Sequence, residues 1–163
     1  MIINPASFIN DFIAQASVVL HRTLSPNLIT HSYQPCPHTP PQLPHGSGAV
    51  YVFSLPAIST APAGANRALK VGKANARSNA RFQTQHYGDN APSTLAKAIR
   101  NNEIIWEYIG YPPHTSVTGD WMKQSLDRDS FFVAPCPDQK RIVGLLEVYT
   151  KARLGPVYEG SLT

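Results

Sequence analysis

Two short runs of strand-forming residues, close together in the sequence, constrain the fold of this chain more than any other feature. Residues 49–54 read AVYVFS, an alternating run of β-branched and aromatic residues that is typical of a strand. Residues 67–72 read RALKVG and indicate a second strand. Proline and glycine between Pro56 and Gly64 indicate a turn. The two runs therefore predict an antiparallel hairpin with a long loop.

The residues before this hairpin divide into a helix and an irregular arm. Residues 5–22 are expected to be helical, because four apolar side chains fall near helical spacing: Phe8, Phe12, Ala16 and Val19. Residues 33–48 are crowded with proline, histidine and glycine, which predicts a linker or a wrapped arm. We therefore place an N-terminal helix and proline-rich arm at residues 1–47 and the main domain at residues 48–163.

Helices and short strands alternate after the hairpin. The pattern predicts helices over residues 77–87, 93–101, 118–126 and 138–154, and strands over residues 104–109 and 131–135. The last helix carries an apolar stripe and is followed by glycine and proline, which typically end a helix. We expect an α/β (α+β) fold with a small, mainly antiparallel, three-stranded central sheet flanked by helices.

Composition narrows the environment and the partners only weakly. The net charge of +4 and the pI near 9.2 are compatible with a polyanionic partner, although many proteins without a nucleic-acid role are equally basic. No stretch approaches the ~20 apolar residues of a membrane span, and the apolar N-terminal segment lacks the basic region of a signal peptide. Cys36 and Cys136 have no metal-ligand spacing. We expect a cytoplasmic protein with reduced thiols and no membrane partner.

Cationic side chains gather where the second strand passes into the next helix. Lys70 and Lys73 lie three apart, and Arg77 and Arg81 lie four apart on one helical face that Gln85 continues. A helix N-terminus adds partial positive charge and free N–H groups. This corner is either a phosphate site or a solvated basic face, and composition alone favours the basic face.

Glu147 is the charged residue within an otherwise apolar stretch of the last helix, GLLEVY. One interpretation is a helix-surface glutamate that pairs with Lys151 four residues later. The other is a ligand for a hard cation such as Mg²⁺, which one or two carboxylates typically hold while it keeps several waters.

In order and spacing, these segments resemble the GIY-YIG nuclease superfamily over about residues 48–160. The first triplet of that family corresponds to Ala49-Val50-Tyr51, and the second to Lys70-Val71-Gly72. Lys73 stands where a lysine normally follows the second triplet, and Arg81 stands where a helical arginine comes next.

The resemblance continues downstream. His86 or Tyr87 corresponds to a histidine or tyrosine one turn after the arginine, and Glu147 corresponds to a metal-binding glutamate. Residues 156–159 resemble the Pro-x-Tyr-Asn-like end of the family.

Three residues depart from the family pattern. Ala49 replaces a glycine, Lys70 replaces a tyrosine as it does in a branch with some restriction endonucleases, and Glu159 replaces an asparagine. The literal YIG triplet at residues 108–110 is followed by no lysine and lies too far from Tyr51 for a hairpin, so we interpret it as coincidence.

The resemblance implies a metal-dependent endonuclease that hydrolyses the phosphodiester bonds of DNA, with RNA also open. Tyr51 would activate water, and the positive charge of Lys70 would favour its phenolate. Lys73 and Arg81 would stabilise the phosphate, and Glu147 would hold one Mg²⁺ or Mn²⁺.

Four further side chains have supporting roles in this scheme. His86 would contact phosphate or assist proton transfer, or it is a helix-end surface histidine. Arg77, Gln85 and Glu159 are expected to contact nucleic acid, and Glu159 could instead be a second carboxylate near the metal.

Two other functions stay open. The departures from the family pattern would also suit a nucleic-acid-binding module that has lost cleavage. A toxin or restriction-type defence nuclease would have the same residues. The apolar N-terminal helix could mediate homodimerisation, which would help an enzyme with one site to cut both strands.

Overall fold

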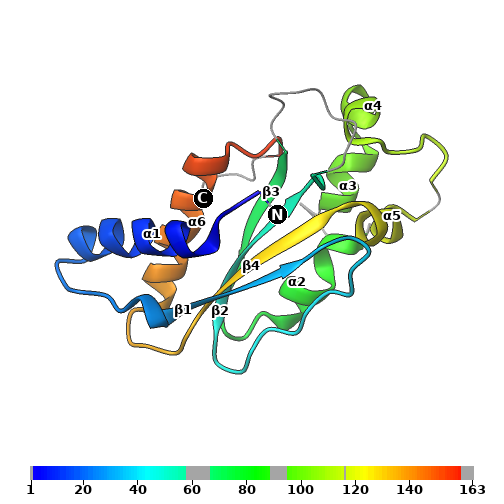
Figure 1. The fold of residues 1–163 in the computed structure, drawn as a ribbon. Coiled ribbons are helices and arrows are strands. Elements are labelled where there is room, and N and C mark those ends of the chain that lie inside the picture. The colour runs from blue at the N-terminus through cyan, green and yellow to red at the C-terminus, as the bar shows by residue number, and fades with distance from the viewer. Residues whose placement is uncertain (1, 58–66, 89–94, 116, 159–163) are drawn as a thin grey trace.

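A four-stranded antiparallel sheet forms the centre of the computed structural model, which describes residues 2–57, 67–88, 95–115 and 117–158 (Figure 1). The strand order is β1-β4-β2-β3. The strands are β1 (Ile29–Gln34), β2 (Gly48–Ser54), β3 (Ala68–Ala74) and β4 (Asp127–Val133). The α+β class is thus as expected, whereas the expected number of three strands is wrong.

The expected hairpin is formed by β2 and β3. The two strands pair antiparallel, with Tyr51 opposite Gly72 and Val50 opposite Lys73. β2 also pairs antiparallel with β4, so β2 is an inner strand, and all seven of its residues are buried. The continuous apolar and aromatic character of the β2 sequence follows from burial of both its faces, because its residues contribute alternately to the two cores on either side of the sheet.

The fourth strand comes from the N-terminal region and pairs with a strand almost a hundred residues later. Ile29 lies opposite Val133, and the ladder continues to Gln34 opposite Arg128. Polar contacts support it: His31 Nε2 lies 2.8 Å from Asp129 Oδ1, and the Tyr33 hydroxyl donates to Asp127 over 2.7 Å. The strand was missed because its sequence, ITHSYQ, is mostly polar and its partner is distant.

The strand expected over residues 104–109 is also wrong. Those residues form a 3-10 turn, η3 (Glu103–Ile105), and a short helix, α4 (Trp106–Ile109). The Trp106 indole donates to the Ile99 carbonyl oxygen over 2.7 Å, which fixes the turn on the preceding helix. Gly110 ends α4 in the left-handed conformation at φ 70°, so the glycine of the literal YIG triplet is a helix cap.

Helices cover both faces of the sheet (Figure 1). One face packs against α1 (Pro5–Val19) and α6 (Gln139–Leu154), which is followed by Gly155 in the left-handed conformation. The other face packs against α2 (Asn79–Gln83), η2 (Gln85–Tyr87), α3 (Leu95–Arg100) and α5 (Thr118–Ser125). The helix expected over residues 77–87 is two short segments, and the start of the helix expected over residues 93–101 lies outside the described residues.

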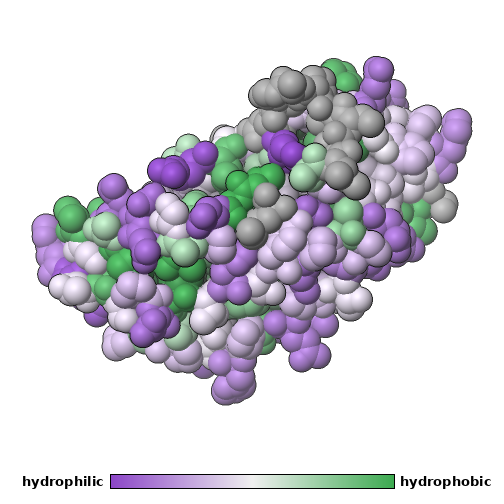
Figure 2. All heavy atoms as spheres, in the orientation of Figure 1, coloured by the Kyte–Doolittle hydropathy of each residue, from purple (hydrophilic) through white to green (hydrophobic). Residues whose placement is uncertain are grey.

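The apolar stripe of α1 is used within the chain. Phe8, Phe12 and Ala16 are buried in the core beneath α1 and α6. Val19 was expected on the same stripe but is 55% exposed, and its neighbour Val18 is 73% exposed. The surface around α1 shows apolar patches among hydrophilic side chains (Figure 2). Packing inside the monomer thus accounts for most of the stripe.

Candidate active site

Tyr51 lies on an inner strand and its side chain is fully buried. The phenol ring crosses the backbone of Gly72 on β3. A Cβ atom added to Gly72 would lie 2.6 Å from the ring and from the hydroxyl oxygen of Tyr51. Real side chains do not tolerate such an approach, so the glycine that ends Lys70-Val71-Gly72 is required by the tyrosine opposite it.

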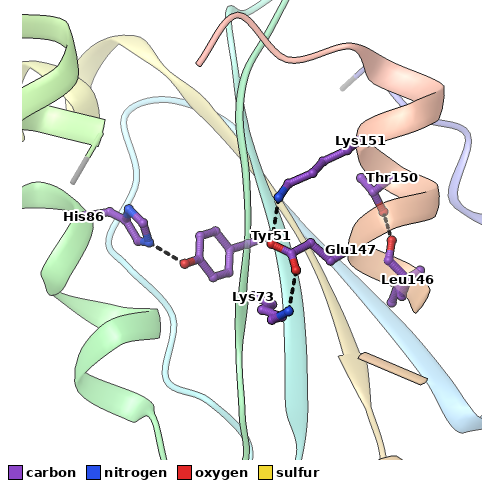
Figure 3. A network of polar contacts seen from close by, with 7 residues as sticks. All are labelled: Tyr51, Lys73, His86, Leu146, Glu147, Thr150 and Lys151. Atoms are coloured by element: carbon purple, nitrogen blue, oxygen red, sulfur yellow. Dashed lines mark hydrogen bonds and ion pairs between the residues drawn. The ribbon is translucent and has the colours of Figure 1, made fainter. Parts of the chain in front are cut away.

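The Tyr51 hydroxyl forms a hydrogen bond with Nε2 of His86, which lies in η2 and is 5% exposed (Figure 3). Burial is the largest cause that lowers the pKa of His86, to about 3, and the positive charges of Arg128, Lys70 and Arg81 lower it further. An imidazole with this pKa is uncharged at neutral pH. Its Nε2 lone pair can therefore accept the phenol hydrogen.

The pKa of Tyr51 is raised, not lowered. Burial raises the pKa to about 12, against the opposing charges of Arg81 and Arg128, and the negative charge of Glu147 raises it too. The expected partnership between Lys70 and a Tyr51 phenolate is therefore corrected in two respects. Desolvation of the phenolate outweighs the nearby cations, and the cations that act on Tyr51 are the two arginines.

Glu147 on α6 is held between two lysine side chains (Figure 3). Its Oε2 lies 2.7 Å from Nζ of Lys73 on β3, and its Oε1 lies 3.0 Å from Nζ of Lys151 one helical turn later. Burial raises the pKa of Glu147, but the hydrogen bonds from Lys73 and Lys151 outweigh it, so the net pKa is below the usual value. The carboxylate is thus ionised at neutral pH and ties α6 to β3.

Lys70 and Arg81 complete the positive charge around this region. Lys70 on β3 is half-buried, and its pKa is lowered first by burial and then by the charges of Lys151 and Arg81. Arg81 on α2 is exposed, and it acts on Tyr51, Lys70 and His86. The six residues expected to be catalytic or metal-binding are therefore linked by a chain of contacts and charge interactions, in which Lys73 joins through its ion pair with Glu147: Tyr51, Lys70, Lys73, Arg81, His86 and Glu147.

Of the residues expected to contact nucleic acid, the structure describes Arg77 and Gln85. Arg77 is exposed and lines a groove of about 520 Å³ between the loop after β3 and the start of α6, together with Lys140 and Val143. Gln85 is half-buried in η2. Glu159 lies outside the described residues. The segment before it runs along the edge of β3, where the Tyr158 N–H donates to the Leu69 carbonyl oxygen over 2.8 Å.

Two buried cations at this site were not singled out by the sequence. Lys151, expected only as a surface partner of Glu147, is 9% exposed. Arg128 on β4 is fully buried and packs over the rings of Tyr51, Phe53 and Phe82. The sequence around Arg128 is Asp-Arg-Asp-Ser, a polar run that lies outside the strand expected over residues 131–135. The two flanking aspartates gave no signal of burial.

Among the described residues, Glu147 is the carboxylate that was expected to bind the implied divalent metal. Within the described ranges, no three His, Cys, Asp or Glu side chains form a group that could hold a metal ion. Glu147, with its side chain 13% exposed, offers two hard oxygen ligands. Its chemistry fits a Mg²⁺ ion that keeps most of its waters, provided that the ion replaces Lys73 or Lys151 at one oxygen.

Comparison with known proteins adds no relative: no family model, no curated protein and no solved structure matches this chain. The fold and the side-chain geometry therefore define the class, an α+β protein with a buried tyrosine–histidine pair beside a lysine–glutamate–lysine cluster. Across the described part of the chain, no helix is both long and apolar enough to cross a membrane.

Proposed function

We propose that the protein is a metal-dependent endonuclease that hydrolyses the phosphodiester bonds of DNA. One observation carries the proposal: the Tyr51 hydroxyl is bonded to an uncharged His86, the charges of Arg81 and Glu147 act on Tyr51, and Lys73 pairs with Glu147. These side chains come from β2, η2, α2, β3 and α6. A phosphodiester is an anion that needs a base for water and fixed positive charge for its transition state.

The Tyr51–His86 pair can relay one proton, and His86 carries a positive charge until it releases that proton, a state that its pKa of about 3 makes short-lived. With His86 as acceptor, the phenol oxygen keeps lone pairs that can accept a hydrogen bond from water. As water attacks phosphorus, its proton passes to the Tyr51 oxygen while the phenol proton passes to His86 Nε2. The phosphorus bond to the 3′-oxygen breaks, the 3′-oxygen takes a proton from solvent, and His86 returns its proton to solvent. The products are a 5′-phosphate and a 3′-hydroxyl.

Positive side chains at the edge of the site supply the electrostatic contribution. Arg81 is exposed and Lys73 has a side chain 39% exposed, so both can reach a phosphate that arrives from solvent. Fixed cations beside the phosphoryl oxygens stabilise the charge that develops during attack. Glu147 would hold the Mg²⁺ or Mn²⁺ ion, which supplies Lewis-acid polarisation of a phosphoryl oxygen when it is bound.

A second function has its own supporting observation. Tyr51 is fully buried and its pKa is raised to about 12, which makes the phenol a poor base at neutral pH. Glu147 is also engaged by two lysines. These features suit a nucleic-acid-binding module of the same fold with weakened cleavage.

The deciding experiment measures cleavage of supercoiled and single-stranded DNA with Mg²⁺, Mn²⁺ or EDTA. Wild type should cut only with metal, and Tyr51→Phe should cut at least about 100-fold more slowly, the usual scale of a lost acid–base group. Tyr149→Phe is the matched control. The Tyr149 ring packs between α6 and α1 on the other face of the sheet, and its hydroxyl has no hydrogen-bond partner among the described residues. Retained DNA binding without cutting under any condition would favour the binding module.

A further inference from the structure

Arg128 occupies the inner strand position next to the catalytic tyrosine. It lies on β4 opposite Phe53 of β2, and the neighbouring pair in that ladder is Val52 opposite Asp129. Because side chains alternate along a strand, Arg128 faces the Tyr51 side of the sheet, whereas Asp127 and Asp129 face the other. Asp127 and Asp129 contact Tyr33 and His31 there.

The guanidinium of Arg128 is enclosed by aromatic rings and neutral oxygens. It lies 4.3 Å from the ring centroid of Phe82 and 5.2 Å from that of Tyr51. It donates to the Phe82 carbonyl oxygen over 2.6 Å and to the Tyr87 hydroxyl over 3.2 Å. Its Nε has no hydrogen-bond partner, and no ion pair joins Arg128 to a carboxylate, among the residues that the structure describes.

A buried cation without a paired carboxylate is costly for folding. Removing a charge from water carries a large penalty, and aromatic faces and neutral hydrogen-bond acceptors offset only part of it. An apolar side chain of similar length would fill this space at lower cost. The charge lies over the Tyr51 ring as well as over the rings of Phe53 and Phe82, which places it beside the Tyr51–His86 pair and indicates a role beyond packing.

We propose that Arg128 is a positioning residue of the Tyr51–His86 pair, in which its guanidinium holds the phenol ring and keeps a fixed positive charge behind the pair. The proposal rests on the proposed function, because that function assigns the pair to water activation. Arg128 acts from the interior, where solvent and salt do not screen it, unlike the exposed Arg81.

The charges that face the pair come from four elements. His86 faces Arg128 on β4, Lys70 on β3 and Arg81 on α2, and Arg128 is the largest of these in lowering the pKa of His86, after burial. Tyr51 faces Arg81, Arg128 and the negative charge of Glu147 on α6. A positive charge at Arg128 therefore favours an uncharged His86, which is the form that accepts the phenol hydrogen.

Arg128 also links the pair to the proline-rich arm. The Tyr87 hydroxyl that accepts from Arg128 lies 2.7 Å from Nε2 of His38 in that arm. Tyr87 is adjacent to His86 in η2, so these contacts fix the turn that presents the imidazole to Tyr51.

The test is an NMR titration of the His86 imidazole, which needs no cleavage activity. Wild-type His86 should remain uncharged below pH 5. Arg128→Met should raise the pKa of His86 by on the order of one unit, and Arg128→Lys should restore most of the wild-type value. Arg153→Met is the matched control, because Arg153 lies over the Tyr149 ring at 5.8 Å on the other face of the sheet. An unchanged His86 in a folded Arg128→Met variant would overturn the proposal.

Two further readouts separate the possible failures. If Arg128→Met does not fold, the NMR titration of His86 is made in the wild type and in Arg128→Lys. A wild-type His86 that titrates near 6.5 overturns the proposal. With an active enzyme, Arg128→Met should move the acid limb of the pH–rate profile upward while Arg128→Lys should not. A His86 shift in a protein that cuts no nucleic acid would support the role of Arg128 and sink the nuclease function.

Discussion

The phenol ring of Tyr51 lies against Gly72 on the neighbouring strand, where an added Cβ would come within 2.6 Å of the ring and of its hydroxyl oxygen. Gly72→Ala should therefore displace Tyr51 from His86, destabilise the fold by about 1–3 kcal/mol through overpacking, and abolish cleavage. Urea denaturation and the DNA-cutting assay check both effects. Gly144→Ala is the control, because nothing lies within 4 Å of its added Cβ, and it should stabilise α6 by about 0.5–1 kcal/mol.

Replacement of the carboxylate at Glu147 should strongly reduce the metal-dependent cleavage of DNA. Glu147→Gln keeps the shape of the side chain but loses the charge that a divalent ion requires, so metal-dependent cleavage should fall at least about 100-fold. Binding of Mn²⁺ measured by calorimetry should weaken in parallel. The exposed Glu103 gives a control, Glu103→Gln, that should change neither quantity. Metal-dependent cutting that survives Glu147→Gln would remove Glu147 from the metal site.

Substitutions of Arg81 and Arg77 should have different effects on catalysis and on DNA binding. Arg81 acts on Tyr51 and His86, so Arg81→Ala should lower turnover by about 10²–10³-fold, as expected for loss of a transition-state donor. Arg77 lines the groove between the loop after β3 and the start of α6. Arg77→Ala should therefore weaken DNA binding and lower the slope of log affinity against log salt concentration by about one, with turnover nearly unchanged. Single-turnover kinetics and binding at several salt concentrations separate these effects. Equal losses of turnover would contradict the assignment.

Stability should fall as the pH drops below about 6.5. The pKa of His86 is lowered from 6.5 to about 3 and that of His38 to about 4, mainly by burial. Between these values and 6.5 the unfolded chain binds protons that the folded chain does not, so acid favours unfolding. For His86 the slope should reach about 1.4 kcal/mol per pH unit.

Urea denaturation between pH 7 and pH 5 tests this slope. The window lies above the ordinary pKa of glutamate, 4.5, and the pKa of Glu147 is lower still, so loss of its ion pairs contributes only at more acidic pH. His86→Gln should reduce the slope to the part that His38 contributes, whereas replacement of the exposed His114 should leave it as in wild type. A flat wild-type profile would contradict the burial of two uncharged histidines.

Local patterns in the sequence identified the elements whose own residues decide their structure. The alternation in residues 49–54 and 67–72 correctly predicted a hairpin, and the apolar spacing of α6 with Gly155 after it predicted that helix closely. The ladder then fixes which residues face each other. Tyr51 opposite Gly72, and Lys73 on the face of α6, follow from antiparallel pairing and strand alternation.

Elements with distant partners could not be predicted in this way. β1 is polar and depends on β4, and residues 104–109 have strand-forming side chains but no neighbouring strand to pair with. Intrinsic strand preference is weak compared with packing context, so tertiary contacts override it.

By itself, the sequence determined the hairpin, the principal helices, and the order of tyrosine, lysine, arginine and glutamate along the chain. Only the tertiary structure decided the charge states and partners of these residues. It buried Tyr51 and so raised its pKa to about 12, joined it to His86, enclosed Arg128 behind the pair, and placed Glu147 between Lys73 and Lys151. The reason is physical: desolvation and charge–charge energies depend on distances in space, and strand pairing across a hundred residues sets those distances.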